Sequence, residues 1–137
     1  MALVLDTGPL LAALDADDID HRRCRELIES AEEDLVVPAL VLSELDYWCH
    51  QRLGVQAWLT FLEDVIDGAY TLEAPIHTDL IRCREIQKQY ADQPIGVVDA
   101  SVLALTERLR EDKLATLDSR HFSVVRPAHV ESLRLLP

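Results

Sequence analysis

The sequence predicts an α/β protein, a three-layer α/β/α sandwich around a central, mainly parallel sheet. Short apolar runs suited to buried strands alternate with longer segments in which apolar residues recur every three or four positions, as on one face of a helix. Strands separated by helices pair in parallel through crossover connections, which place helices on both faces of the sheet. The length of 137 residues suits one core, and we expect a single domain over residues 1–137.

The first third of the chain contains two expected strands and two helices. Residues 2–5 are apolar and lead through Asp6 into a short helix that contains Pro9. Proline is tolerated in a first helical turn because its missing N–H would have no partner there. A second helical pattern covers residues 24–31, and residues 35–37 form the second strand.

The middle of the chain is mostly helical. Residues 40–53 and 55–66 have helical spacing of apolar side chains, and Gly54 and Gly68 follow the two segments. Glycine commonly ends a helix because it adopts the left-handed conformation at the position after the C-cap. Residues 69–72 are expected to form the third strand.

The last third returns to alternation of helix and strand. A helix is expected from residue 75 to about residue 90, followed by a helix over residues 97–110 that is apolar on most faces. A helix of that kind should be buried in the middle of the molecule. Residues 113–117 and 124–125 are expected to be strands.

The chain is strongly acidic, with a net charge of −12. Proteins that bind nucleic acid through bulk electrostatics present a basic surface, so any contact with phosphates must be local. A bound divalent cation is one way in which an acidic pocket can meet a phosphate. The charge also suits a basic protein partner, although solubility alone explains it more simply.

The sequence shows neither a membrane-targeting pattern nor a cysteine pattern typical of disulfides or metal sites. No apolar stretch reaches the roughly 20 residues that cross a bilayer, and the first charge is Asp6, so a basic signal-peptide region is missing and we expect a cytoplasmic protein without membrane contact. Cys24, Cys49 and Cys83 show no metal-site spacing and are expected to be reduced thiols or small apolar residues.

Four acidic residues lie inside or beside apolar runs, where an ionised side chain is costly unless it is paired or binds a metal. They are Asp6, Glu44, Asp99 and Asp118. Two of them follow expected strands, and ligands of open parallel sheets bind at the carboxyl ends of strands. Several carboxylates meeting at that edge, without matching lysines, predict a site for Mg²⁺ or Mn²⁺.

Each acid also has a simpler interpretation. The two acids that follow strands could cap a helix or a turn, and the helix dipole could stabilise Asp99 in a first helical turn. Glu44 could pair with Arg82 or Arg84. Zinc is disfavoured because the five histidines have no paired spacing, and no phosphate-binding loop or nucleophile elbow is present.

The chain resembles the PIN-domain family and, more narrowly, VapC-type toxins of bacterial toxin–antitoxin pairs. The resemblance covers almost the whole chain, and its order of motifs is more specific than any one of them. The motifs are Leu5-Asp6-Thr7 with Pro9-Leu10-Leu11, Ser43-Glu44-Leu45 after Val36-Val37-Pro38, Val98-Asp99-Ala100-Ser101, and Ala115-Thr116-Leu117-Asp118-Ser119-Arg120-His121-Phe122.

The resemblance implies a metal-dependent endoribonuclease whose acidic site is Asp6, Glu44, Asp99 and Asp118. It also implies an RNA substrate, a homodimer and an inhibiting VapB-type antitoxin. In such a site the first three acids would hold Mg²⁺, with Mn²⁺ as a substitute, and Asp118 would complete it.

Several neighbouring residues are candidates for supporting roles. Thr7, Ser101 and Thr116 could orient the ligands. Arg120 and His121 are close enough in sequence to the site to contact a phosphodiester. Arg120 could equally bridge one of the surface acids.

The two middle helices carry four large apolar side chains, more than one small core needs: Trp48, Trp58, Phe61 and Leu62. We expect an amphipathic antitoxin helix to cover part of this surface. Two other classes of function stay open. A metal-dependent phosphatase of another α/β family would usually have a second aspartate where Gly8 stands, and a catalytically silent acidic binding module would share the acids without cleaving RNA.

Overall fold

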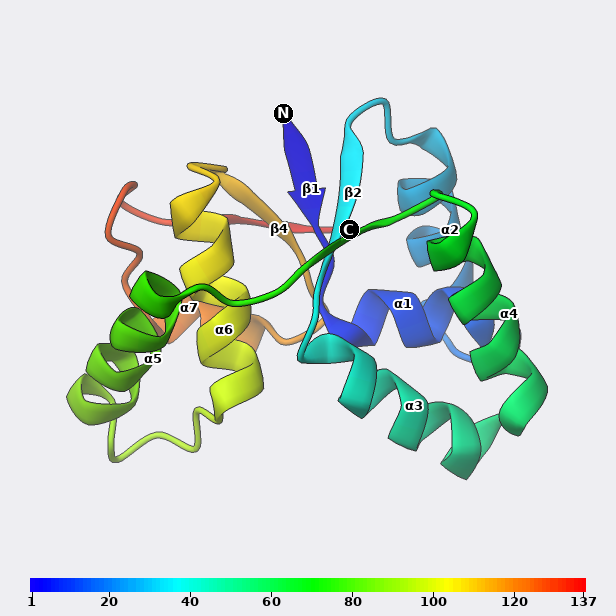
Figure 1. The fold of residues 1–137 in the computed structure, drawn as a ribbon, viewed down its shortest axis with the longest axis horizontal. Coiled ribbons are helices and arrows are strands. Elements are labelled where there is room, and N and C mark those ends of the chain that lie inside the picture. Colours follow the sequence, from blue (N-terminus) through cyan, green and yellow to red (C-terminus); the bar gives the residue numbers. More distant parts are fainter.

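The computed structural model describes residues 1–137, and five short strands run through its centre (Figure 1). β1 (Ala2–Val4) pairs with β2 (Asp34–Pro38), and β2 pairs with β3 (Thr71–Glu73), both in parallel. The registers place Leu3 beside Leu35. β1 and β2 are rich in buried aliphatic residues, as expected of parallel strands covered on both faces, whereas β3 at the edge is mostly exposed.

The second group of strands continues the same sheet. β4 (Lys113–Ala115) pairs in parallel with β5 (Arg134–Leu136). A parallel bridge joins Leu5 to Ala115, and the N–H of Asp6 donates to the carbonyl of Ala115 at 2.9 Å. The order across the sheet is therefore β3-β2-β1-β4-β5, with every carboxyl end at the same edge.

Four helices lie on one side of the strands in Figure 1. They are α1 (Thr7–Leu14), α2 (His21–Ser30), α3 (Val41–Arg52) and α4 (Val55–Ile66). α1 packs against α2 and α3, and α3 packs against α4.

Three helices lie on the other side (Figure 1). They are α5 (His77–Gln89), α6 (Val97–Arg108) and α7 (Ser119–Val124). α6 packs on β1 and β2, and α5 packs on α6. The expected three-layer architecture with a parallel central sheet is confirmed.

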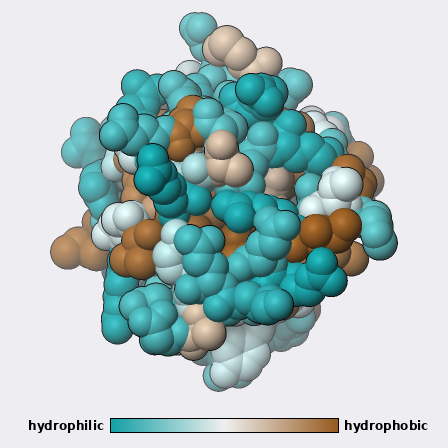
Figure 2. Space-filling view, turned by 90° about the vertical axis from the view of Figure 1, so that its left-hand side faces the viewer, coloured by the Kyte–Doolittle hydropathy of each residue, from teal (hydrophilic) through white to brown (hydrophobic).

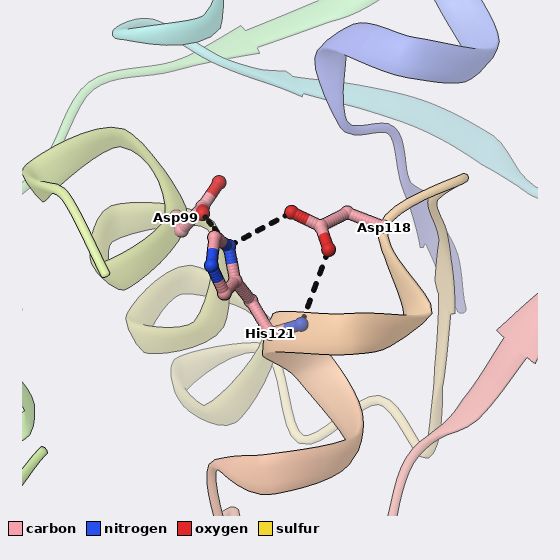
Figure 3. Close-up of side chains that lie close together, drawn as sticks. All are labelled: Asp99, Asp118 and His121. Atoms are coloured by element: carbon pink, nitrogen blue, oxygen red, sulfur yellow. Dashed lines mark hydrogen bonds and ion pairs between the residues drawn. The ribbon is translucent and has the colours of Figure 1, made fainter. Parts of the chain in front are cut away.

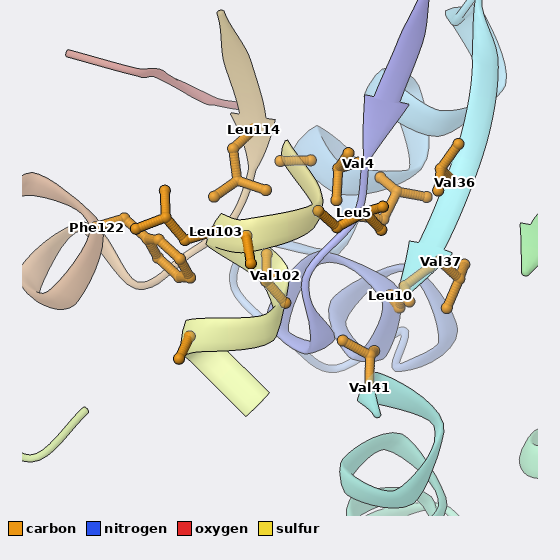
Figure 4. Close-up of a cluster of buried hydrophobic side chains, with 14 of the residues drawn as sticks. Val4, Leu5, Leu10, Val36, Val37, Val41, Val102, Leu103, Leu114 and Phe122 are labelled. Carbon is orange, nitrogen blue, oxygen red and sulfur yellow. The ribbon is translucent and has the colours of Figure 1, made fainter. Parts of the chain in front are cut away.

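A single cluster of 23 buried apolar residues forms the core (Figure 4). It joins the strand side chains Leu3 and Val4 to Val41 of α3 and Leu103 of α6. Every residue from 100 to 106 is buried, so α6 is the central helix that its apolar sequence predicts. The three cysteines are free and buried, and none of the helices combines the length and apolarity needed to span a membrane.

Two expectations about the elements after β3 are wrong. Residues 124–125 are not a strand, because the carboxylate of Asp118 accepts the N–H of His121 at 3.1 Å and starts α7 there. The fifth strand is β5, which lies ten residues further along the chain. α5 begins at His77 and not at Pro75, since Asp79 accepts the N–H of Ile76 at 3.0 Å.

Candidate metal centre

Two neighbouring strands place two acids at the carboxyl edge of the sheet. Asp6 follows β1 and precedes α1, and only 5% of its surface is exposed. Asp118 follows β4 and is the N-cap of α7. Because β1 and β4 are adjacent, the fold brings together two acids that are 112 positions apart in the sequence.

Two helices supply the other acids. Glu44 lies in the first turn of α3, the helix that follows β2, and Asp99 lies in the first turn of α6. Helix N-termini favour anionic side chains, which explains how both carboxylates are tolerated near the core. All four acids line one pocket of about 440 Å³, together with Thr7, Gly8, Leu11, Trp48 and Leu117. No lysine or arginine lines it.

Two threonine hydroxyls hold the acids in place. The Thr116 hydroxyl donates to Asp6 Oδ2 at 2.9 Å and accepts the N–H of Asp118 at 3.0 Å. The Thr7 hydroxyl donates to Glu44 Oε1 at 2.7 Å. Both threonines are buried, so these bonds link the strand ends to the pocket in fixed geometry.

A histidine joins the remaining two acids (Figure 3). Nδ1 of His121 lies 2.9 Å from Oδ2 of Asp99 and 2.9 Å from Oδ2 of Asp118. From the sequence, His121 is expected only to contact substrate, and this bridge between two acids is not predicted. The available signal was its position three residues after Asp118 at the start of a helix, which puts the two side chains on one face.

Comparison with known proteins agrees with this geometry. The family model of the PIN domain matches residues 3–126. The chain belongs to the PIN-domain family. It is 39% identical over 125 residues to Ribonuclease VapC26 of Mycobacterium tuberculosis (strain ATCC 25618 / H37Rv), covering 91% of this chain and 93% of that protein.

Solved PIN-domain structures share the fold. The crystal structure of Mycobacterium tuberculosis VapC20, a Sarcin-Ricin loop cleaving toxin, superposes with a TM-score of 0.81 at 18% identity and covers 98% of this chain and 100% of that chain. The crystal structure of VapBC2 from Rickettsia felis, bound to a DNA fragment from their promoter, gives a TM-score of 0.71 at 16% identity, with full coverage of both chains.

Burial and mutual repulsion shape the electrostatics of the PIN-domain pocket. Burial raises the pKa of Asp6 from 3.8 to about 6, and the charges of Asp99 and Glu44 add to this, while hydrogen bonds from the Thr7 N–H and the Thr116 hydroxyl oppose it. Burial also raises the pKa of Asp99, with the hydrogen bond from His121 opposing and the charge of Asp118 adding to the shift. A cation would relieve this repulsion.

Two residues expected near the site have other surroundings. Ser101 is buried, but its hydroxyl donates to the carbonyl of Val98 at 2.7 Å, and it does not line the pocket. It follows Asp99 by two positions, so it points to another side of α6. Arg120 is exposed on α7 and also lies outside the pocket lining.

The alternative ion pair of Glu44 is also absent. Arg82 pairs with Glu107 at 2.8 Å and Arg84 is an exposed residue of α5. Glu44 is held by the Thr7 hydroxyl and points into the pocket. The carboxylates therefore form a cluster without a lysine or arginine in the pocket lining, and carboxylate oxygens are the ligands that Mg²⁺ and Mn²⁺ prefer.

Proposed function

We propose that this PIN domain, residues 1–137 as one unit, is a divalent-metal-dependent endoribonuclease that acts in the cytoplasm as a VapC-type toxin. The observation that carries the proposal is the pocket at the carboxyl edge of the sheet, where four carboxylates meet and which no lysine or arginine lines. The similarity to a ribonuclease over 91% of the chain supports RNA as the substrate.

Asp6, Glu44 and Asp99 are the proposed ligands of Mg²⁺ or Mn²⁺, and Asp118 completes the site. When bound, the cation would bind a phosphate oxygen and lower the pKa of a water molecule. Thr7 and Thr116 hold two of the carboxylates through hydrogen bonds of 2.7 and 2.9 Å, so the ligands are positioned before the cation arrives.

RNA would reach the pocket despite the net charge of −12, because its phosphates would meet the cation rather than a basic surface. Arg120 is exposed two residues beyond Asp118 and takes part in no ion pair of the structure, so it is available for a phosphate of the substrate. This favours a contact of Arg120 with the substrate over an ion pair of Arg120 with a surface acid.

We also propose that a VapB-type antitoxin covers the apolar side chains of α3 and α4. Five of these are well exposed: Tyr47, Trp48, Val55, Leu59 and Ile66. Phe61 is buried in the core and is not part of this surface. Trp48 also lines the acidic pocket, so a segment that covers it lies next to the carboxylates, where an arginine of the partner could bind.

A homodimer is proposed through a different face. The face on the α5 side is mostly hydrophilic but is interrupted by hydrophobic patches (Figure 2). The exposed apolar residues of α5 and the adjoining segments include Ile76, Leu80 and Val97. A two-fold interface would bury each of them against the second copy.

RNA cleavage by the purified protein tests the proposed activity. We expect cleavage with Mg²⁺, none with EDTA, and a loss of at least about 100-fold in Glu44→Gln. Asp46→Asn is the matched control, since Asp46 lies on the same helix, pairs with His50 at 3.1 Å and does not line the pocket. Turnover of small phosphomonoesters instead of RNA would support the phosphatase alternative, and no turnover of either would support the binding module.

A further inference from the structure

His121 bridges two of the four acids and has no role in the function proposed so far. Its Nδ1 atom lies at hydrogen-bond distance, 2.9 Å, from one oxygen of Asp99 and from one oxygen of Asp118. The two acids come from α6 and from the end of β4, so the imidazole is the group that joins these elements at the pocket (Figure 3).

The ring has little freedom to move. It lines a cavity of about 10 Å³ together with Asp99 and core side chains such as Ile95, Phe122 and Val125. That cavity has room for one water molecule at most. The ring therefore has core side chains on one side and carboxylates on the other, and little space in which to rotate.

The surroundings of the other ring nitrogen, Nε2, indicate whether Nδ1 donates a hydrogen bond or binds a metal. Nε2 of His121 is buried and has no hydrogen-bond partner. If Nδ1 bound a cation, Nε2 would carry the ring proton and would be a buried N–H without an acceptor, which proteins avoid. Histidine ligands normally donate that second N–H to a partner. With the proton on Nδ1, the ring donates to Oδ2 of Asp99 at 2.9 Å and no buried N–H is left unpaired. Oδ2 of Asp118 lies 2.9 Å from the same nitrogen.

We propose that His121 is a positioning residue: its Nδ1 atom lies between Asp99 and Asp118, in the place where a second cation would otherwise join them. A cation shared by these two oxygens would compete with the imidazole nitrogen for the same space, since Mg²⁺ binds its oxygen ligands at about 2.0–2.1 Å. The pocket would then hold one divalent cation, with Asp6, Glu44 and Asp99 as the residues that would bind it. This inference rests on the proposed metal centre.

Mn²⁺ binding, followed by the loss of the free-ion signal in electron paramagnetic resonance, tests the proposal without any activity measurement. Three proteins are compared: the unchanged chain, His121→Asn and His121→Leu. Asparagine keeps an N–H donor two bonds from Cβ, where Nδ1 lies, whereas leucine fills similar space without a donor. Thermal unfolding without metal shows that each variant is folded.

We expect one Mn²⁺ per chain in the unchanged protein. The Mn²⁺ affinity of His121→Asn should lie within about threefold of the affinity of the unchanged protein, and that of His121→Leu should be about 10- to 100-fold lower. Equal affinity in His121→Leu, equal losses in both variants, or two ions of similar affinity in the unchanged protein would overturn the role of His121 and leave the metal centre standing. No Mn²⁺ binding to the unchanged protein would overturn both.

Discussion

At the scale of single residues, the acidic pocket is built at a cost in stability. Asp6 is almost fully buried next to other carboxylates, and its pKa of about 6 in the folded chain compares with 3.8 for an unperturbed aspartate. A raised pKa means that the folded state binds the proton more tightly than the unfolded state does. Its stabilising contribution is complete below about pH 4 and is lost as the pH rises through 6.

Asp6→Asn should therefore stabilise the metal-free protein at neutral pH. The difference between 3.8 and about 6 corresponds to about 3 kcal/mol at pH 7.5 and to about half of that at pH 5. Urea unfolding at both pH values with EDTA measures the change in the free energy of unfolding. Asp92→Asn on an exposed loop is the control. A variant no more stable than the parent at pH 7.5 would show that Asp6 is not strained by burial.

Asp99→Asn should separate catalysis from folding. An amide oxygen can still accept the N–H of His121, so we expect the fold to persist and the melting temperature without metal to stay level or rise. RNA cleavage should be lost because a neutral amide binds Mg²⁺ poorly. Circular dichroism and cleavage are measured on the same sample. Unfolding of the variant would instead assign Asp99 to stabilisation of the α6 N-terminus.

At the scale of elements, two helices on one side of the sheet are joined by partly buried ion pairs. Asp79 of α5 is 3% exposed; it accepts the N–H of Ile76 at 3.0 Å and Nε of Arg108 from α6 at 3.1 Å. Arg82 and Glu107 form a second link at 2.8 Å. These bonds hold α5 on α6, the helix that carries Asp99.

Asp79→Ala should destabilise the protein by about 2–4 kcal/mol, since it removes a helix cap and leaves Arg108 without its main partner. Urea unfolding at pH 7.5 measures the change, with Asp92→Ala as the exposed control. A loss no larger than that of the control would mean that the Asp79–Arg108 contact contributes little in solution.

At the scale of the whole molecule, charge and exposed apolar surface govern association. The net charge of −12 and the apolar residues of α3 and α4 suit a partner segment that is both basic and amphipathic. Such an interaction should weaken with salt, because the Debye length falls from about 10 Å at 0.1 M to about 3 Å at 1 M.

Native mass measurement should give a dimer at micromolar concentration, and a basic amphipathic helical peptide should bind to it. A peptide with the same apolar face but acidic polar residues is the matched control and should not bind. Fluorescence of Trp48, which is 43% exposed beside the pocket, should respond only to the basic peptide. A strict monomer with no response to either peptide would contradict the expected interactions.

The sequence by itself determined the alternation of strands and helices and the central position of α6. It also singled out the four acids that line the pocket. Each of these depends on local pattern: the apolar period, a glycine after a helix, or a carboxylate next to an apolar run. Gly54 and Gly68 adopt φ values of 92° and 90°, as helix-ending glycines do.

Only the tertiary structure decided what depends on pairing between distant segments. Residues 124–125 have strand-like side chains, but the helix α7 starts after the Asp118 cap and ends at Val124. The strand that pairs with the open edge of β4 is Arg134–Leu136. Of the three hydroxyl residues expected to orient the ligands, Thr7 and Thr116 bond the acids, whereas Ser101 bonds the carbonyl of Val98. The contact of His121 with Asp99 and Asp118 is visible only in the tertiary structure. Hydrogen bonds of this kind join residues up to 110 positions apart, and no local pattern encodes such distances.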